Sequence, residues 1–297
     1  MSVISPQDLF DAEFLTSLER LHITARRVAR GGRHAEQRSR DLGSGIEFRD
    51  FRPYVPGDDF RGIDWTIYRR LGRVFLRLFE ELEDLPVYML PDISQSMYLE
   101  SPPRAIAGLR CALGLTSIAL NQHDSVGLFP FADTLRVALR PQSGKGRLLR
   151  FADVMSKLEP GAATDLTTSL QAFGAMKLRE GLVVVISDFF DSNGIEAVIK
   201  SLKQVRHRLL LVQLTRTSDR DPGLSGDLQL RDCETGAVED VSATPAVQKR
   251  YQDAYDRFQT QLTEFARRRN AGLLQLDVER DVVEQLASLF ETGSMPV

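Results

Sequence analysis

The stretch Leu182-Val183-Val184-Val185-Ile186, followed by Ser187-Asp188, decides the fold class. Five consecutive branched aliphatic residues are typical of a strand buried on both faces, as in a parallel sheet that helices cover. A helix is predicted after this strand at 194–203, and a second apolar strand at 208–214. A strand, a helix and a strand in this order form one unit of a parallel α/β sheet.

The alternation of strands and helices extends through the chain from about residue 86. Apolar runs and helical periodicity define the other elements. They are strands 87–90, 125–130, 135–139 and 273–276, a hairpin of 228–231 with 238–241, and helices 104–121, 146–158, 166–176, 247–269 and 282–290. We therefore expect an α/β protein with a doubly wound, mostly parallel sheet of the Rossmann type.

Polar residues follow the central strands at the edge where such sheets bind ligands, beyond the carboxyl ends of the strands. The candidate ligands are Asp92, Ser94 and Ser96 after strand 87–90, Thr164 before helix 166–176, and Asp188 after strand 182–186. All offer hard oxygen atoms with no histidine or cysteine nearby in sequence, which favours Mg²⁺ or Mn²⁺ over zinc. The alternative for the hydroxyls, and for Asp165, is ordinary helix capping.

The first 84 residues lack this alternating pattern. An apolar stripe predicts a helix at 6–30, and seven arginines lie between residues 20 and 40. We interpret this arm as a solvated surface. The alternative is that its arginines form a docking patch for an anionic partner. Residues 44–84 carry a turn at 56–59, a short helix within 60–68 and a strand at 73–79. The predicted organisation is an N-terminal helix and arm at 1–43, an extension at 44–84 and the α/β domain at 85–297.

The series Asp92-x-Ser94-x-Ser96, Thr164 and Asp188 resembles the metal-ion-dependent adhesion site of von Willebrand factor A domains. The resemblance covers about residues 85–290 and implies a von Willebrand A-like domain. Two carboxylates and neutral hydroxyls leave a divalent cation with open positions, which water fills at rest. In the resembled site, an Asp or Glu of a partner protein replaces one water, so that the metal bridges two chains.

A second resemblance lies upstream of this domain. Its residues are Glu47-Phe48, Arg52-Pro53-Tyr54, Pro56-Gly57-Asp58-Asp59, Arg61, Ile63-Asp64-Trp65 and Arg69. They look like the signature of the bacterial domain-of-unknown-function 58 family, whose members place this segment before a von Willebrand A-like domain. Many members are encoded beside a MoxR-type AAA+ ATPase, which implies such an ATPase as a partner in the maturation or assembly of other proteins.

The signature segment allows two interpretations. The first is a small structural subdomain in which its arginines pair with its acidic residues. The alternative is a docking surface for the ATPase, formed by Glu47, Arg52, Tyr54, Asp58, Asp59, Arg61, Asp64 and Trp65.

Two residues set this chain apart from the resembled metal site. Pro91 precedes Asp92 where an apolar strand residue is usual, and proline removes a donor from the strand ladder. Asp191 lies three residues after Asp188 and is a competing or supporting carboxylate.

The expected function is a metal-dependent protein-interaction module and not an enzyme. The alternative is a divalent-metal-dependent phosphoester hydrolase, because an open cation polarises phosphate. However, no second Asp lies two residues after Asp92, and the chain has neither a P-loop nor a Gly-x-Ser-x-Gly motif. A further alternative is nucleic-acid binding through the arginine-rich arm, which lacks interleaved aromatic residues for base stacking.

Composition narrows the class of protein. The chain has 297 residues, a net charge of −3, 42% hydrophobic and 27% charged residues. These values are ordinary for a globular protein and exclude a polycation or a disulfide scaffold. Cys111 and Cys233 lie far apart, which fits a reducing compartment. No apolar run approaches the length of a membrane span and no signal peptide is evident, so we expect a cytoplasmic protein.

Overall fold

The structure is a computed structural model that describes residues 9–11, 14–18, 21, 47–56, 58–80 and 85–292. The described chain divides into two compact units. The larger unit contains the described residues up to Leu21 together with 85–292, and the smaller unit contains those from 47 to 80. The predicted arginine-rich arm lies outside the described residues.

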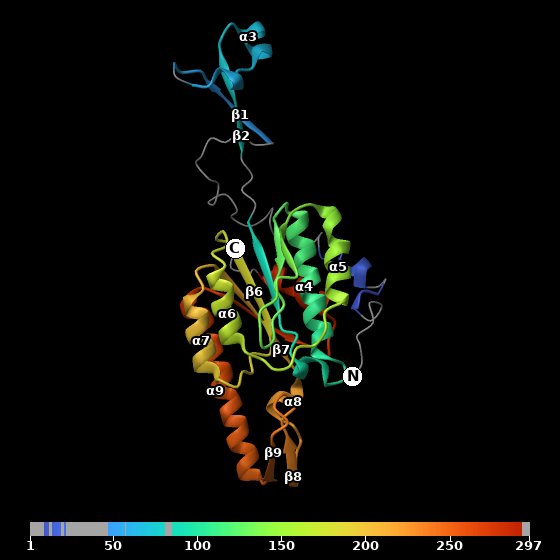
Figure 1. Ribbon diagram of the computed structural model, residues 1–297. Coiled ribbons are helices and arrows are strands. Elements are labelled where there is room, and N and C mark those ends of the chain that lie inside the picture. The colour runs from blue at the N-terminus through green and yellow to red at the C-terminus, as the bar shows by residue number, and fades with distance from the viewer. Residues whose placement is uncertain are drawn as a thin grey trace. The chain divides into compact units, whose positions relative to one another are not determined.

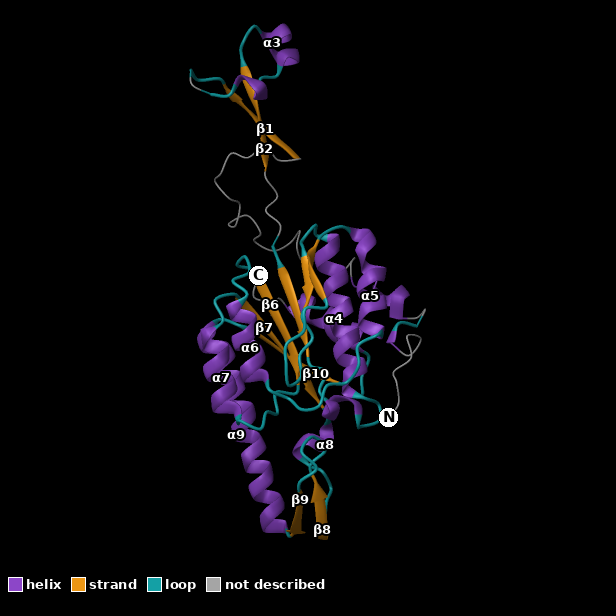
Figure 2. Cartoon of the chain, in the orientation of Figure 1, coloured by secondary structure: helices purple, strands orange, loops and turns teal. Residues whose placement is uncertain are grey.

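A six-stranded sheet forms the centre of the larger unit (Figure 2). Its strand order is β10-β7-β6-β3-β4-β5, and all neighbours are parallel except β5, which runs antiparallel to β4. The strands are β3 (Val87–Pro91), β4 (Val126–Leu128), β5 (Leu139–Gln142), β6 (Leu182–Ser187), β7 (Arg208–Thr215) and β10 (Gly272–Asp277). The prediction of a doubly wound, mostly parallel sheet is confirmed.

Helices cover both faces of this sheet (Figure 1). One face packs against α4 (Arg104–Asn121), α5 (Leu148–Ser156) and α10 (Val282–Thr292), and the other against α6 (Leu166–Ala175), α7 (Ile195–Gln204) and α9 (Pro245–Arg269). The side chains of β6 alternate between the two cores: Val184 and Ile186 join the first, and Val183 and Val185 join the second. The central apolar run is therefore buried on both faces, as its sequence predicts.

The N-terminal residues belong to the first of these cores. Leu9, Phe14, Leu18 and Leu21 are all buried there. The prediction of one unbroken helix from residue 6 is wrong, because the chain is not helical at Asp11. The carboxylate of Asp11 instead accepts a hydrogen bond of 2.7 Å from the backbone N–H of Phe14, the first of the described helical residues 14–18.

A hairpin of β8 (Gly226–Arg231) and β9 (Val238–Ala243) projects from the larger unit. Figure 1 shows it beside the first turns of α9, on the side where the parallel strands end. Most of its residues are exposed to solvent. It follows α8 (Thr217–Arg220), a short helix that the sequence analysis did not predict.

The smaller unit pairs β1 (Glu47–Pro53) with β2 (Phe75–Glu80) in an antiparallel ribbon. The helix expected within 60–68 is instead a 3₁₀ helix, η1 (Phe60–Gly62), followed by α3 (Trp65–Leu71). The break arises because Asp64 caps α3, its carboxylate accepting hydrogen bonds from the N–H groups of Thr66 and Ile67.

The strand expected at 135–139 is also displaced. Leu135 makes only an isolated bridge to Phe131, and the ladder with β4 begins at Leu139. Since β5 is an edge strand, it tolerates Pro141, which has no N–H to donate. Two further short 3₁₀ helices are η2 (Gln95–Tyr98) and η3 (Lys145–Arg147). Of the helices described, none has the length and apolar content to cross a membrane.

Candidate metal centre

The ends of β3 and β6 lie side by side at the carboxyl edge of the sheet. Pro91 pairs with Ile186 in the ladder, and the N–H of Asp92 donates to the Ile186 carbonyl oxygen at 2.8 Å. The carbonyl oxygen of Pro91 accepts from the N–H of Phe131 at 3.0 Å. The proline therefore occupies the last position of its strand, where the ladder continues around it.

Hydrogen bonds connect the polar side chains of the loop after β3. The carboxylate of Asp92 accepts from the N–H of Ser94 at 2.9 Å and from the hydroxyl of Ser187 at 2.7 Å. The hydroxyl oxygens of Ser94 and Ser96 lie 3.0 Å apart. Ser94 precedes η2, but its side chain makes no capping hydrogen bond. The serine side chains of this loop are thus held beside Asp92 and do not cap the next helix.

Asp188 enters the same region from the end of β6. Its carboxylate accepts a hydrogen bond of 3.0 Å from the N–H of Phe190, and the residue is 8% exposed. Between the two, Phe189 adopts a left-handed backbone with φ of 62°, and its ring is buried in the core. The charge of Asp92 acts on Asp188, so the two carboxylates lie within electrostatic reach of each other.

Thr164 reaches the site on the loop that precedes α6. The N–H of Gly161 donates to the Ile93 carbonyl oxygen at 2.7 Å, and the N–H of Asp165 donates to the Ala132 carbonyl oxygen at 2.9 Å. Asp165 is the helix cap, since its carboxylate accepts from the N–H of Thr168 at 2.7 Å. Thr164, the residue before this cap, is buried and does not cap the helix.

Asp191 also acts at the start of α6. Its carboxylate accepts a hydrogen bond of 2.9 Å from the N–H of Leu166 and one of 2.8 Å from the N–H of Asn193. The residue therefore holds the helix that follows Thr164, which is a supporting position.

Glu234, in the turn of the β8–β9 hairpin, contacts the site directly. One carboxylate oxygen accepts from the hydroxyl of Thr164 at 2.9 Å, and the other accepts from the N–H of Thr164 at 3.0 Å. The sequence analysis did not identify Glu234. Because 70 positions separate it from Thr164, no local pattern signals the contact.

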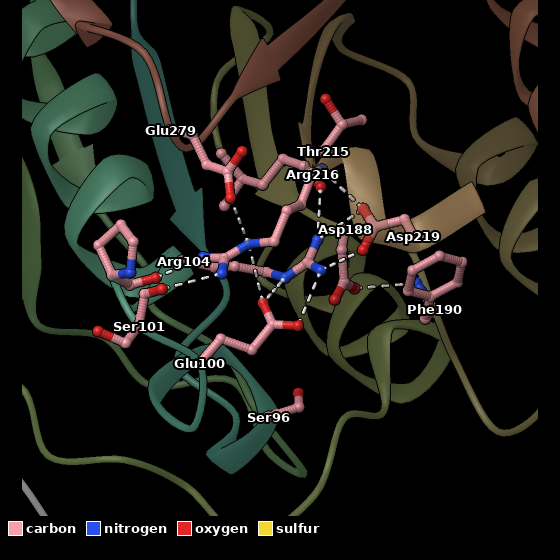
Figure 3. Close-up of polar contacts among 12 residues, drawn as sticks. Ser96, Glu100, Ser101, Arg104, Asp188, Phe190, Thr215, Arg216, Asp219 and Glu279 are labelled. Atoms are coloured by element: carbon pink, nitrogen blue, oxygen red, sulfur yellow. Dashed lines mark hydrogen bonds and ion pairs between the residues drawn. The ribbon is translucent and has the colours of Figure 1, made fainter. Parts of the chain in front are cut away.

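A network of ion pairs lies beside the site (Figure 3). The guanidinium of Arg104, at the start of α4, donates to both carboxylate oxygens of Asp219 and to Glu100 at 2.7 Å. Arg216 binds the carbonyl oxygens of Ser101 and Pro102, so the network ties the loop of Ser94 and Ser96 to the loop after β7. Of the candidate ligands, Asp188 and Ser96 are labelled in this view.

The electrostatics of the two buried aspartates favour a bound cation. Burial raises the pKa of Asp92 to about 6 and that of Asp188 to about 7, and the charge of Asp92 adds to the shift at Asp188. Arg104 opposes the shift at Asp188 only in part. The hydroxyl of Tyr98 is buried without a hydrogen-bond partner among the described residues, and the charge of Asp92 contributes to its raised pKa.

This donor set fits a hard divalent ion. Two carboxylates and three hydroxyls from Asp92, Ser94, Ser96, Thr164 and Asp188 are the oxygen ligands that Mg²⁺ and Mn²⁺ prefer. Within the described ranges, no three His, Cys, Asp or Glu side chains gather as a metal-binding group of their own. A metal held here would therefore depend on hydroxyl ligands as well as on the two carboxylates.

The other predicted residues lie in the smaller unit. Some of them form ion pairs or cap a helix, and others are exposed to solvent. Arg52 forms an ion pair of 2.7 Å with Asp58, which also accepts from the N–H of Val55, and Asp64 caps α3. Tyr54 is half-buried and Asp59 is exposed, and nothing is described for the side chains of Glu47 and Arg61. Trp65 is 59% exposed and contacts Tyr68 edge to face. Paired charges and exposed aromatic rings thus occur in the same small unit.

Solved structures of low sequence identity align with the larger part of the chain. BatB from Bacteroides thetaiotaomicron is 15% identical, with 70% of this chain and 98% of that chain covered and a TM-score of 0.45. An aerotolerance-related membrane protein from Bacteroides fragilis is 17% identical, with 70% and 99% covered and a TM-score of 0.40.

Sequence relatives cover nearly the whole chain. Uncharacterized proteins of Mycobacterium tuberculosis and Mycobacterium bovis are each 25% identical over 279 residues, which is 92% of this chain and 88% of theirs. The model of the family described as protein of unknown function DUF58 matches residues 50–261, a span that includes most of the signature segment and all five candidate ligands. The chain belongs to the DUF58 family.

Proposed function

We propose that this protein is a metal-dependent protein-interaction module in which Asp92, Ser94, Ser96, Thr164 and Asp188 hold Mg²⁺ or Mn²⁺. The observation that carries the proposal is the placement of two buried carboxylates, with raised pKa values, among hydroxyl groups at one edge of the sheet. When bound, the cation would offer an open coordination position, which a carboxylate of a partner protein fills.

The residues of this chain orient the site and keep it rigid. Ser187 and the N–H of Ser94 hold the Asp92 carboxylate in place, and the N–H of Phe190 holds that of Asp188. Because these hydrogen bonds fix each carboxylate before the ion arrives, little side-chain entropy is lost on binding.

Hydrolysis is the less favoured function, because Asp92 is not followed two residues later by a second Asp, as it is in phosphoaspartyl hydrolases. The thiol of Cys233 lies within electrostatic reach of Asp188. Burial, together with the charges of Glu234 and Asp232, raises the pKa of this thiol. A raised pKa keeps the thiol protonated, whereas a nucleophilic cysteine needs a lowered one. We therefore infer that the site binds and does not turn over a substrate.

We further propose a MoxR-type AAA+ ATPase as the partner, in the maturation or assembly of other proteins in the cytoplasm. This step rests on the resemblance of residues 47–69 to the family signature. Within that segment, Trp65 and Phe60 are 59% and 69% exposed, which offers apolar area for contact with a partner.

The test combines calorimetry with binding of a purified MoxR-type ATPase. We expect the wild type to bind Mg²⁺ and Mn²⁺ at one site, and Asp92→Asn to lose that binding. Asp153→Asn, an exposed change on α5, is the control and is expected to behave as the wild type. Capture of the ATPase is expected to fail in chelator and with Asp92→Asn. Absence of metal binding in the wild type would refute the metal-bridging function.

A further inference from the structure

An open pocket lies between the loop after β6 and helix α9. Its volume is about 290 Å³, and its walls include Phe190 and Asp191 on the loop and Tyr251, Tyr255 and Phe258 on the helix. Helix α9 runs beside α7, which begins directly after this loop (Figure 1). The pocket therefore belongs to a packed part of the larger unit.

Aromatic rings form most of the wall. The ring of Phe190 stacks on that of Phe258, with centroids 5.0 Å apart and an interplanar angle of 30°, and the rings of Phe258 and Tyr255 lie 6.2 Å apart. These contacts hold the rings together. Phe190 and Tyr251 are nevertheless 42% and 45% exposed, so both residues remain accessible to a ligand.

Asp191 contributes a negative charge to this wall. Its carboxylate accepts hydrogen bonds from the N–H groups of Leu166 and Asn193 and, at 2.9 Å, from the side-chain amide of Asn193. All of these donors are neutral, so they orient the carboxylate without compensating its charge.

A second negative charge acts on the pocket. Burial raises the pKa of Tyr251 and that of Tyr255, and in both cases the charge of Asp219 adds to the rise. The charge of Arg104 opposes the rise at both phenols, but more weakly. These two phenols therefore lie in a negative electrostatic environment.

These features favour a cation over a neutral ligand. The faces of aromatic rings carry partial negative charge and attract cations. A purely apolar side chain in the pocket would instead shield Asp191 from water without giving it a partner, which is unfavourable. Among cationic side chains, arginine fits best, because its planar guanidinium stacks on aromatic rings and donates to a carboxylate at the same time.

We propose that this aromatic pocket binds an arginine side chain of a partner protein, with the guanidinium against the rings of Phe190 and Tyr251 and paired with Asp191. The inference rests on the proposed function for the class of partner, a protein, but it requires no metal ion. The N–H of Phe190 donates to the carboxylate of Asp188 at 3.0 Å, so the pocket adjoins the candidate metal centre (Figure 3). A partner segment that carries an acidic residue and an arginine close together would contact both.

The test measures binding of N-acetylarginine amide by fluorine NMR of protein labelled with fluorotyrosine, in EDTA. The chain has six tyrosines, so replacing Tyr251 or Tyr255 with phenylalanine assigns the signal of each. We expect the arginine derivative to shift both signals. N-acetylcitrulline amide has almost the same shape without the charge, and it is expected to bind about tenfold more weakly.

Two variants of the pocket separate the contributions of ring and charge. Phe190→Leu keeps an apolar side chain but removes the ring face, and Asp191→Asn removes the negative charge. Each is expected to weaken binding of the arginine derivative about tenfold. Phe51→Leu makes the same replacement at a phenylalanine of the smaller unit that is 37% exposed, and this matched control is expected to bind as the wild type does.

The outcomes separate this inference from the proposed function. Equal binding of the arginine and citrulline derivatives, or tighter binding of N-acetylnorleucine amide, would show that the pocket selects shape or apolar character and would overturn the inference. Unchanged signals of Tyr251 and Tyr255 would do the same, even where calorimetry detects the metal site. Because EDTA removes divalent ions, selective binding of arginine supports the inference even if the wild type binds no Mg²⁺ or Mn²⁺, and only the metal-bridging function then fails.

Discussion

Replacing Gly161 by alanine is expected to destabilise the loop that carries Thr164, although it adds only one methyl group. A Cβ atom at this position would lie 2.2 Å from the Cβ of Ala132, whereas ordinary contacts begin at 3.4 Å. The chain must therefore separate by about 1.2 Å, the difference of these two distances. Ala132 is 1% exposed and accepts a hydrogen bond from the N–H of Asp165, so it has little room to yield.

The expected loss in the free energy of unfolding follows from the cost of overpacking at other buried sites. Forcing an extra methyl group into a packed position costs about 1–3 kcal/mol. For a domain of this size, that corresponds to a fall in the melting temperature of about 2–4 °C for each kcal/mol. The loop also donates from the N–H of Gly161 to Ile93 at 2.7 Å, so its displacement moves Thr164 relative to Asp92. We therefore expect weaker Mn²⁺ binding as well.

Gly174 supplies a matched control for the same substitution. It lies in α6, and a Cβ atom there would meet no atom within 4 Å. Gly174→Ala is expected to raise the free energy of unfolding by about 0.5–1 kcal/mol, because alanine loses less conformational entropy in a helix. Urea unfolding and calorimetry with Mn²⁺ would measure both variants. Equal stability of the two variants, or Mn²⁺ binding unchanged in Gly161→Ala, would refute the placement of the loop.

Three further predictions concern a histidine, an arginine and the cysteines. Burial lowers the pKa of His207, so the contribution of this residue to the free energy of unfolding is expected to be complete above about pH 6.5 and to be lost as the pH falls through the folded pKa. The difference between the urea-unfolding pH profiles of the wild type and His207→Asn isolates this contribution from the opposite one of Asp92 and Asp188, and identical profiles would contradict it. Arg104→Leu leaves the Asp219 carboxylate buried without its guanidinium partner, so the free energy of unfolding is expected to fall by about 3–5 kcal/mol in denaturant unfolding. The double variant with Asp219→Asn is expected to recover part of that loss, and wild-type stability of the single variant would contradict the prediction. Iodoacetamide is expected to modify the exposed Cys233 in the native protein. Cys111 is buried, which raises the pKa of its thiol to about 12, so it is expected to react only after unfolding. Mass spectrometry of the native and unfolded protein would show both results.

The sheet was predictable because its central strands carry their own signal. The run 182–186 is apolar at every position, which is typical of a strand covered on both faces. Edge elements carry weaker signals. The residues of β5 alternate poorly and include Pro141, so the predicted strand was placed at 135–139, and the observed one begins at Leu139. Strand β1 was not predicted, since charged residues interrupt its apolar ones.

The ligand candidates were recognisable for a related reason. In a parallel sheet, the residues after each strand meet at one edge, and β3 and β6 are neighbours, so Asp92 and Asp188 lie at adjacent strand ends. The contacts that complete the site have no such rule. Arg104 binds Asp219 across 115 positions, and Glu234 binds Thr164 across 70. Each pair depends on how a loop or hairpin outside the sheet returns to it, which only the folded chain specifies.

Residues at the strand ends and residues from the outlying hairpin contribute differently to the charge at the carboxyl edge of the sheet. The strand ends place anionic groups together, and burial makes that placement costly, as the raised pKa values of Asp92 and Asp188 show. The outlying hairpin then adds another negative charge instead of relieving the first two. Because a bound divalent cation would offset this negative charge, Mg²⁺ or Mn²⁺ is expected to raise the free energy of unfolding, and Asp92→Asn is expected to abolish that increase.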